Sequence, residues 1–230
     1  MNLPTPLFEG TLLRRYKRFF TDVELLDGTV VVAHTPNTGS MKQCAVPGSR
    51  VLVSTTDNPK RKLKYTLELI MVAGRWVDTH TQRTNRVVEE ALRKNQIPSF
   101  VDFQVQPEYR FGESRIDFFL QKADEKVLIE VKNVTLCCRP ETACFPDAVT
   151  TRGQKHLREL LGAKQQGYRA VIFFLVQRSE ATEFSPADDI DPEYGRLLRH
   201  VVAEGVEVLA YKTIVTPEEN RVGEPIPIVL

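Results

Sequence analysis

Short apolar runs separated by turn residues make up the first third of the chain. Six segments before residue 79 are rich in β-branched and other apolar residues, and turn signals such as Asp27-Gly28 and Pro47-Gly48 lie between them. Strands this short and this numerous predict a small, closed or nearly closed β-barrel of the OB type over residues 1–79. The predicted strands are Gly10–Phe20, Val23–Leu26, Val30–His34, Arg50–Thr55, Tyr65–Val72 and Arg75–Asp78.

The pattern changes near residue 79, where apolar residues begin to recur at helical spacing. A stripe that includes Val87, Val88 and Leu92 predicts a helix over Thr81–Asn95. The segments that follow give residues 80–230 the α-β-β-β-α-β order of restriction-endonuclease-like folds, and the whole chain a mixed α/β class. They are the strands Val101–Gln106, Ser114–Leu120 and Val127–Lys132, a loop Asn133–Val149, a helix from Thr151 to Gly167, the strand Ala170–Val176, a helix Pro192–Glu204, the strand Val206–Lys212, and an irregular tail in which Ile226–Leu230 could add an edge strand.

Two of these strands form a predicted hairpin that carries facing carboxylates. A register centred on the charged turn pairs Leu120 with Val127. The same register pairs Asp117 with Glu130 and places both on one face with Lys132. Opposed side chains lie ~5 Å apart at Cβ, so two carboxylates repel unless a cation or a shared proton lies between them. The hairpin therefore indicates a metal site, and a solvent-facing edge on which Glu130 and Lys132 neutralise each other is the alternative.

Charge is distributed unevenly along a chain that is almost neutral as a whole. The formal net charge is +1, but residues 1–80 carry +4 and residues 81–230 carry −3. Basic clusters of this kind are typical of nucleic-acid binding, although a solvated surface is the common alternative. Tyr16 adds an aromatic group, and Arg14, Tyr16 and Arg18 are predicted to share one strand face. The clusters contain Arg14, Arg15, Lys17 and Arg18, and then Lys60, Arg61, Lys62 and Lys64.

The sequence shows no membrane-spanning segment and no signal peptide, and this predicts where the protein is located. No apolar run approaches the ~20 residues of a membrane span, and the N-terminal segment lacks the basic and apolar regions of a signal peptide. We therefore expect a cytoplasmic protein with no membrane partner. Free thiols suit that compartment, and the cysteines show no zinc-site spacing. The cysteines are Cys44, Cys137, Cys138 and Cys144.

The chain carries several longer strings of characteristic residues, among them Arg15–Phe19, Pro36–Gly39 and Arg152–Leu160. Together these strings resemble the bacterial and archaeal sugar fermentation stimulation protein family over nearly the whole chain. The resemblance implies an OB-like domain followed by a nuclease-like domain, DNA as the partner, and a role in regulating maltose metabolism. Nuclease activity and a non-catalytic DNA-binding regulator are both open, as is a barrel that binds sugars or protein. A homodimer is compatible with the sequence. The strings are Arg15–Phe19, Pro36–Gly39, Ser114–Phe118, Glu130–Lys132, Phe145–Thr150 and Arg152–Leu160; the loop Cys137–Pro140 departs from the family pattern.

Asp117 with Glu130-Val131-Lys132 also resembles the motif of PD-(D/E)xK nucleases. That resemblance implies that Asp117, Glu130 and the carbonyl of Val131 bind Mg²⁺ or Mn²⁺. It places Lys132 beside the attacking water, where positive charge stabilises the transition state. An acidic residue on the first helix often completes such a shell, and the string beginning Asn85-Arg86 favours Glu90 over Glu89.

Further residues are assigned by the same resemblance. Gln154 matches a glutamine of related nucleases and is implied to hold Lys132 or a phosphate. Lys155 and His156 follow it and are predicted near the site, where they would contact DNA. Arg115 precedes the metal-binding strand segment and is predicted to contact DNA as well.

Overall fold

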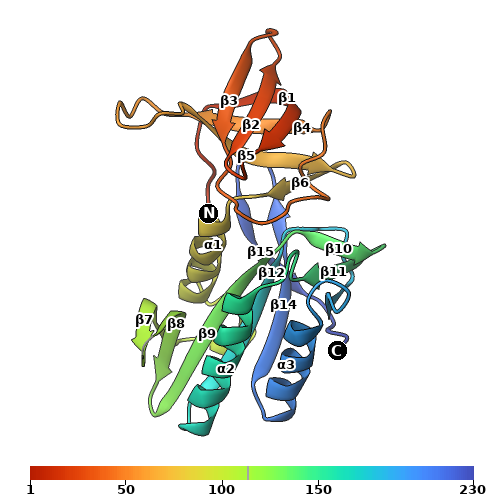
Figure 1. Cartoon of the computed structure of the whole chain (residues 1–230). Helices are drawn as coiled ribbons and strands as arrows, with labels where there is room; N and C mark the ends of the chain where they lie inside the picture. The colour runs from red at the N-terminus through yellow and green to blue at the C-terminus, as the bar shows by residue number, and fades with distance from the viewer. Residues whose placement is uncertain (113) are drawn as a thin grey trace.

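The N-terminal domain is a closed five-stranded barrel. The computed structural model describes residues 1–112 and 114–230, and six of its strands form one sheet in the order β3-β2-β1-β4-β5-β6. A parallel pairing of β3 with β5 closes the first five strands into a barrel, coloured red and orange in Figure 1. The predicted OB-type barrel is confirmed. Its strands are β1 (Leu7–Tyr16), β2 (Phe20–Leu25), β3 (Val30–His34), β4 (Arg50–Thr55) and β5 (Tyr65–Val72), and β6 (Arg75–Asp78) extends the sheet.

One predicted strand of the barrel is wrong. The segment Gly10–Phe20 does not run straight, because Lys17 and Arg18 have φ angles of 47° and 63°. Such left-handed residues turn the backbone out of the extended conformation, and the chain reverses here from β1 into β2. Arg14, Tyr16 and Arg18 therefore do not share one strand face, since Arg18 belongs to the turn.

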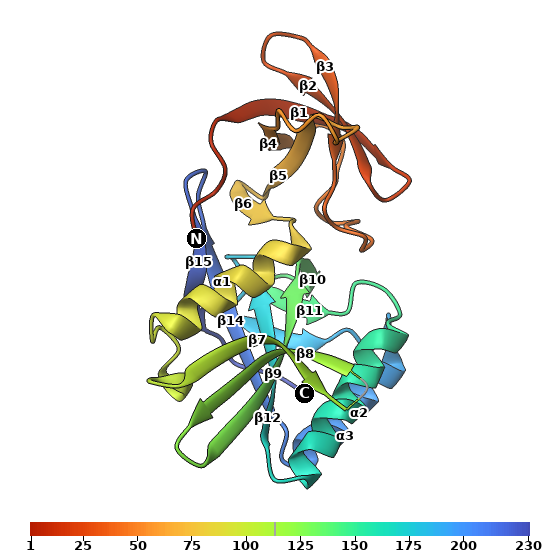
Figure 2. The same ribbon diagram turned by 90° about the vertical axis from the view of Figure 1, so that its left-hand side faces the viewer.

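The second domain packs helices on both faces of a six-stranded sheet ordered β15-β14-β12-β9-β8-β7. The chain order α1, β7, β8, β9, α2, β12 confirms the predicted α-β-β-β-α-β core. Side chains alternate along a strand, so in β12 Phe174 packs in the core under α2 and α3, and Phe173 packs in the core under α1. Figure 2 shows α1 against one face of this sheet and the other two helices behind it. The elements are α1 (Thr81–Arg93), η1 (Pro98–Phe100), β7 (Gln104–Phe111), β8 (Ser114–Lys122), β9 (Glu125–Val134), α2 (Thr151–Gln165), β12 (Arg169–Val176), α3 (Pro192–Ala203), β14 (Glu207–Val215) and β15 (Asn220–Pro225).

The predicted loop Asn133–Val149 contains a hairpin, β10 (Leu136–Arg139) and β11 (Thr142–Phe145), which β13 (Glu183–Pro186) extends into a small sheet. A disulfide joins Cys138 to Cys144. The prediction of four free thiols is therefore wrong for this pair, and Cys44 and Cys137 are the free cysteines within the described chain. The hairpin brings the paired cysteines together because β10 and β11 run antiparallel.

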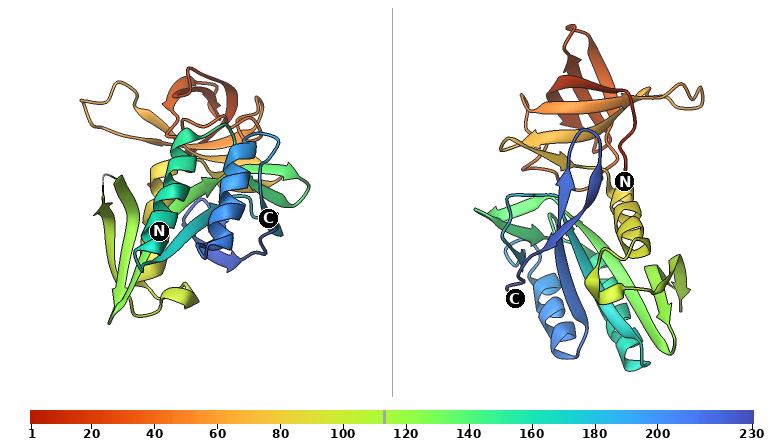
Figure 3. Two further views of the ribbon diagram at one scale, coloured as in Figure 1. Left: turned by 60° about the horizontal axis from the view of Figure 1, so that its bottom comes forward. Right: turned by 180° about the vertical axis from the view of Figure 1, so that it is seen from behind.

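The tail also differs from the prediction. Residues 220–225 form β15, which pairs with β14, whereas Ile226–Leu230 contributes a single bridge between Ile228 and Phe184. In Figure 3 the β14–β15 hairpin rises beside the N-terminus, and Asn2 bridges to Glu219 there. Among the described residues no helix is long and apolar enough to cross a membrane. The cytoplasmic location and the homodimer stay predictions.

A buried ionic network joins the two domains. Arg83 of α1 donates to Asp78 at the end of β6 at 2.9 Å and to Glu68 of β5. Asn220 of β15 donates to the same Asp78 carboxylate at 2.8 Å. All four side chains are buried, and charged groups taken out of water are tolerated only when they are paired. The barrel is therefore attached to the second domain by buried polar contacts to which both domains contribute side chains.

Candidate metal centre and nucleic-acid groove

The predicted hairpin holds its register, and its two strands diverge around Asp117. Pairing of β8 with β9 runs from Lys122↔Glu125 through Leu120↔Val127 to Phe118↔Ile129, which confirms the predicted register over this range. Next along β8, Asp117 Oδ2 accepts a hydrogen bond from the Val131 amide at 2.8 Å. The Asp117 side chain therefore lies against the backbone of β9.

The two carboxylates of the hairpin are held by different helices. Asp117 Oδ1 accepts from Asn85 Nδ2 of α1 at 2.7 Å. Glu130 Oε1 contacts His156 of α2. The helices α1 and α2 pack on opposite faces of the sheet, so the two carboxylates are held from both sides at the point where β8 and β9 diverge.

Asp117 is more basic than an ordinary aspartate. Burial and, after it, the nearby charge of Glu130 raise its pKa to about 6. Hydrogen bonds from the Val131 amide and Asn85, and the charge of Lys132, oppose this shift without cancelling it. The repulsion between the two carboxylates, predicted from the sequence, is therefore present in the fold. A cation placed between them would relieve it.

Glu130 is held from one side by two basic side chains. Its Oε1 lies 2.6 Å from Lys132 Nζ and also contacts His156 Nδ1. Arg152 Nε donates to His156 Nε2 at 3.3 Å, and Lys132 Nζ lies 3.0 Å from His156 Nδ1, so the ring is held on both sides next to Glu130. Burial acts to raise the pKa of Glu130, but the Lys132 charge and the His156 hydrogen bond outweigh it and hold that pKa below its ordinary value.

The hairpin could bind a cation through two carboxylates, those of Asp117 and Glu130, and through the backbone carbonyl of Val131. In the described part of the chain no three His, Cys, Asp or Glu side chains gather as a metal cluster. Mg²⁺ commonly takes one or two carboxylates and keeps several waters, so Asp117 and Glu130 meet its needs. Glu130 Oε2 is buried and has no hydrogen-bond partner among the described residues. The residues present fit a divalent cation, and the Val131 backbone lies beside them.

Two predicted site residues lie elsewhere. The Glu90 carboxylate contacts Lys94 and, at 2.7 Å, the N-terminal ammonium of Met1, and Asn85 occupies the place on α1 that faces Asp117. Gln154 donates to Asp191 at 2.9 and 3.2 Å rather than to Lys132. Asp191 in turn caps α3 through the Tyr194 amide. The roles predicted for Glu90 and Gln154 are therefore wrong; Gln154 links two helices.

An open groove of about 720 Å³ lies between the two domains. Its walls come from residues 37–40 and Lys42 of the barrel, from α1, from β9 and from the segment before α2. Lys132 and Asn85, which hold the two carboxylates, both line it. Of the described residues that line it, Asp147 is the one acidic residue, against Arg15, Arg18, Lys42 and Lys132. The groove is therefore a basic channel that passes the metal centre.

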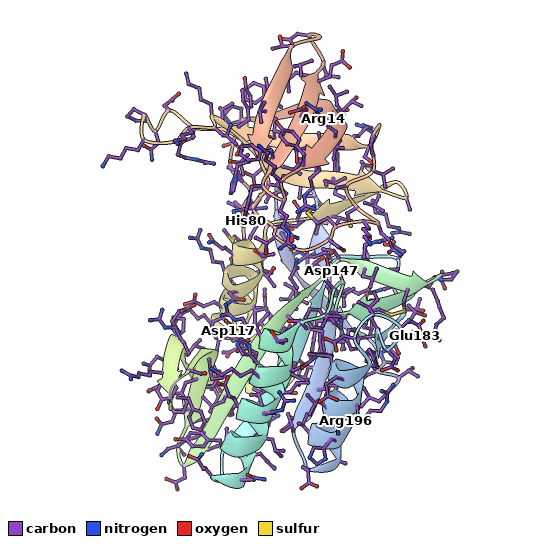
Figure 4. All side chains as sticks on the ribbon, in the orientation of Figure 1. Arg14, His80, Asp117, Asp147, Glu183 and Arg196 are labelled. Carbon is purple, nitrogen blue, oxygen red and sulfur yellow. A yellow bond between two sulfur atoms is a disulfide. The ribbon has the colours of Figure 1, made fainter. Side chains whose placement is uncertain are left out.

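Asp147 fixes the barrel side of this groove. Its Oδ2 accepts from the Ser40 amide at 2.8 Å and from the Ser40 hydroxyl at 3.1 Å. Gln43 and Cys137 exchange two hydrogen bonds across the same junction, at 2.7 and 2.9 Å. Figure 4 shows Asp147 at the level where the barrel meets the second domain, with Asp117 lower on the sheet. Sequence reasoning missed Asp147 and Asn85; both lie inside the family strings, but nothing local marks them as contacts.

The basic residues of the first cluster differ in what they can bind. The Arg15 guanidinium donates to four backbone carbonyls, including those of Asn37 and Gly39 at 2.8 and 3.0 Å. It therefore shapes the Pro36–Ser40 segment and has few donors left for a phosphate. Arg14 pairs with Asp22 at 2.7 Å and lies over the Tyr16 ring, 5.0 Å from its centroid. Arg18 lines the groove, and its neighbour Lys17 is exposed.

The remaining predicted DNA contacts are spread over three surfaces. Lys60, Arg61 and Lys62 lie on the long β4–β5 loop, which projects from the barrel (Figure 1). Arg115 is exposed and pairs with Glu108 at 3.2 Å. Lys155 is exposed and lies 3.4 Å from Glu159. His156, by contrast, is buried against Glu130, so its side chain belongs to the candidate metal centre and is not part of an exposed surface.

Comparison with known proteins identifies both domains. Residues 13–78 match the family model "SfsA N-terminal OB domain", and residues 82–219 match "Sugar fermentation stimulation protein RE domain". A sugar fermentation stimulation protein homolog of Syntrophotalea carbinolica is 65% identical over 228 residues, 99% of each chain, and one of Geobacter metallireducens is 53% identical over 233 residues, 100% of each. The solved structure of Pyrococcus furiosus SfsA in complex with Ca²⁺ matches with a TM-score of 0.90 at 26% identity, over 100% of this chain and 98% of that one. The chain therefore belongs to the sugar fermentation stimulation protein family.

Proposed function

We propose that this protein binds DNA in the groove between its domains and hydrolyses phosphodiester bonds with Mg²⁺ or Mn²⁺. The observation that carries the proposal is the neighbouring carboxylates Asp117 and Glu130, whose partners Asn85 and Lys132 line a basic groove. A relative of the same fold was solved in complex with Ca²⁺, which supports a divalent cation at this pair. Basic grooves attract the phosphate backbone whatever its sequence.

Each residue of the proposed metal centre has a separate role. A divalent cation held by Asp117 and Glu130 would supply positive charge to the phosphate and lower the pKa of bound water. His156 contacts Glu130 Oε1, and Glu130 Oε2 has no hydrogen-bond partner in the described chain. Lys132 Nζ, 2.6 Å from Glu130, supplies positive charge at the groove wall, where negative charge develops during attack. Asn85 orients Asp117 from the other side of the sheet.

The decisive experiment compares cleavage by the full chain with that by Lys132→Ala and Glu130→Gln. Supercoiled, linear duplex and single-stranded DNA are incubated with Mg²⁺, Mn²⁺ or chelator. Lys132→Ala should lower the rate by about a hundredfold or more, as removal of one preorganised donor does. The matched control is Lys164→Ala, which removes an exposed lysine in the last turn of α2, outside the groove lining, and its rate should stay at the wild-type value. Cleavage that survives Lys132→Ala, or wild-type protein that cuts nothing with any metal, overturns the proposal.

Metal binding is tested without activity. A ligand that binds only the folded state stabilises it by about 2.7 kcal/mol at a hundred times its Kd. Mn²⁺ or Ca²⁺ should therefore raise the melting temperature of the wild type, and Glu130→Gln should remove the increase. An equal increase in both proteins would place the cation elsewhere.

The second candidate is a non-catalytic DNA-binding regulator of sugar metabolism, including that of maltose. What favours it is the ion pair that Lys132 already makes with Glu130, together with a centre that has two carboxylates and no three-residue cluster in the described chain. Such a protein would bind DNA with wild-type affinity after Lys132→Ala and would release no product before or after the change.

A further inference from the structure

A second hollow adjoins the groove on the barrel side. It is a cleft of about 430 Å³, within the size range of small-molecule sites. Asn37, Thr38 and Thr81 line both hollows, so the cleft and the groove form one continuous surface. The cleft has no part in holding the metal centre. Figure 4 labels His80, one of its lining residues, near the upper end of α1, close to the barrel.

An aromatic platform stands in this cleft. The rings of Phe19 and His34 are stacked, with centroids 6.5 Å apart and planes 11° apart. Phe19 is 43% exposed, which is unusual for a large apolar side chain with a barrel core available nearby. Burial and the charge of Arg61 both lower the pKa of His34, so its ring is neutral and offers a π face at neutral pH. The platform is therefore flat, aromatic and partly open to solvent.

Positive charge borders the platform on the other side. Arg61 lines the cleft and donates to Thr66 at 3.0 Å, and Lys60 and Lys62 lie beside it on the same exposed loop. The three parts of the cleft come from the β1–β2 turn, the end of β3 and the β4–β5 loop. These are the surfaces through which OB barrels hold oligonucleotides. Aromatic faces that stack on bases, next to cations that contact the backbone, are the chemistry of single-strand binding.

We propose that the Phe19–His34 cleft stacks an unpaired base of single-stranded DNA and leads the strand past Thr38 and Thr81 into the groove. A base inside a duplex is covered on both faces by its neighbours, so only an unpaired base can use this platform. This inference rests on DNA as the ligand and deepens the proposed function, because it names DNA with single-stranded character as the preferred substrate. The Arg14–Tyr16 pair lies outside this cleft.

Binding of three labelled probes tests the proposal, with metal removed by chelation so that nothing is cut. The probes are a short single strand, the same strand with abasic positions, and a blunt duplex of the same sequence. Phe19→Ala should weaken binding of the single strand roughly 5- to 140-fold, the range that loss of one stacked base gives. Its effect on the abasic strand, which keeps the phosphates and loses the bases, should be much smaller.

Controls separate stacking from general damage to the barrel. Phe19→Leu keeps an apolar side chain but removes the aromatic face, so it should weaken binding almost as much as Phe19→Ala. Phe8→Ala removes a similarly exposed phenylalanine, 39% exposed on β1 and outside the cleft, and should leave the single-strand affinity unchanged. The proposal is overturned if wild-type protein binds the abasic strand as tightly as the intact one, or if Phe19→Leu and Phe8→Ala behave alike. The binding assay contains no metal, so a failure to detect DNA cleavage does not affect the base-stacking proposal. Likewise, a failure of the base-stacking proposal does not affect the proposed metal centre.

Discussion

The buried guanidinium of Arg83 should be worth more to stability than any exposed ion pair of the same helix. It contacts the carboxylates of Asp78 and Glu68, and the three side chains are 5%, 1% and 4% exposed in these pairs. Burial opposes the charge on Arg83, but the two carboxylates outweigh it and raise its pKa. In Arg83→Met an unbranched apolar stem remains, while both carboxylates stay buried and lose their cation.

The expected cost of Arg83→Met is about 3–5 kcal/mol, the range for removing one partner of a buried pair. For a chain of this size that corresponds to a fall of roughly 6–20 °C in melting temperature. The matched control is Arg93→Met, because Arg93 pairs with Glu89 on the same helix with its side chain 50% exposed. An exposed i,i+4 pair contributes about 0.3–0.5 kcal/mol, so the control should remain within a degree or two of the wild type.

Equilibrium unfolding in urea and a thermal scan give both differences. A double variant, Arg83→Met with Glu68→Gln, removes one of the two stranded charges and should recover part of the loss, which a double-mutant cycle measures. If Arg83→Met costs no more than Arg93→Met, the network is not the junction that its burial indicates. A double variant that is additive would refute the charge argument even if the single loss is large.

Two further predictions concern α2 and the cysteines. An added Cβ at Gly153 would lie 2.7 Å from Thr150 Cγ2 and 3.1 Å from Tyr194 Cε2, so Gly153→Ala should destabilise the protein by about 1–3 kcal/mol in urea unfolding. Gly162 lies on the same helix with open space around it, so Gly162→Ala should stabilise the protein by roughly 0.5–1 kcal/mol. Equal effects of the two substitutions would contradict the packing around Gly153. Burial raises the pKa of Cys44 to about 11, so an alkylating reagent at pH 8 should leave this thiol unlabelled in the native protein. The denatured chain should show two reactive thiols without reductant and four with reductant. Four reactive thiols under both conditions would contradict the disulfide.

The parts of the fold that sequence could predict are those specified by local periodicity. The helical stripe of α1 and the apolar alternation around the charged turn each arise within a dozen residues, and both are present as predicted. The β10–β11 hairpin was missed because its short strands lack alternation and gain their support from β13, some forty residues later. Tertiary pairing of that kind leaves no mark in a short window of sequence.

The site shows the same limit at the level of side chains. Periodicity could identify the face of α1 near the sheet but could not select Asn85 over Glu90, because the choice depends on where β8 passes the helix. Arg15 looks like a member of a basic cluster, yet its donors are taken by carbonyls 22 to 25 residues away in sequence and by Arg18. The carboxylate pair was found because turn register is local, whereas its distribution between two helices is a property of the packed sheet.

The bracing of the groove from both sides has a consequence for the mechanics of recognition. The Arg83 network, Asp147 with Ser40, and Gln43 with Cys137 tie the two walls together, so the width of the channel is set before any ligand arrives. For DNA bound as we propose, the free energy of fitting DNA into the channel is then the free energy of deforming the DNA. Smooth bending of a 20–30 bp duplex by 40–90° costs on the order of 1–6 kcal/mol, and flexible base steps lower that cost. In DNA bound in this way, a nick, gap or mismatch would be selected because it bends easily, without any base being identified.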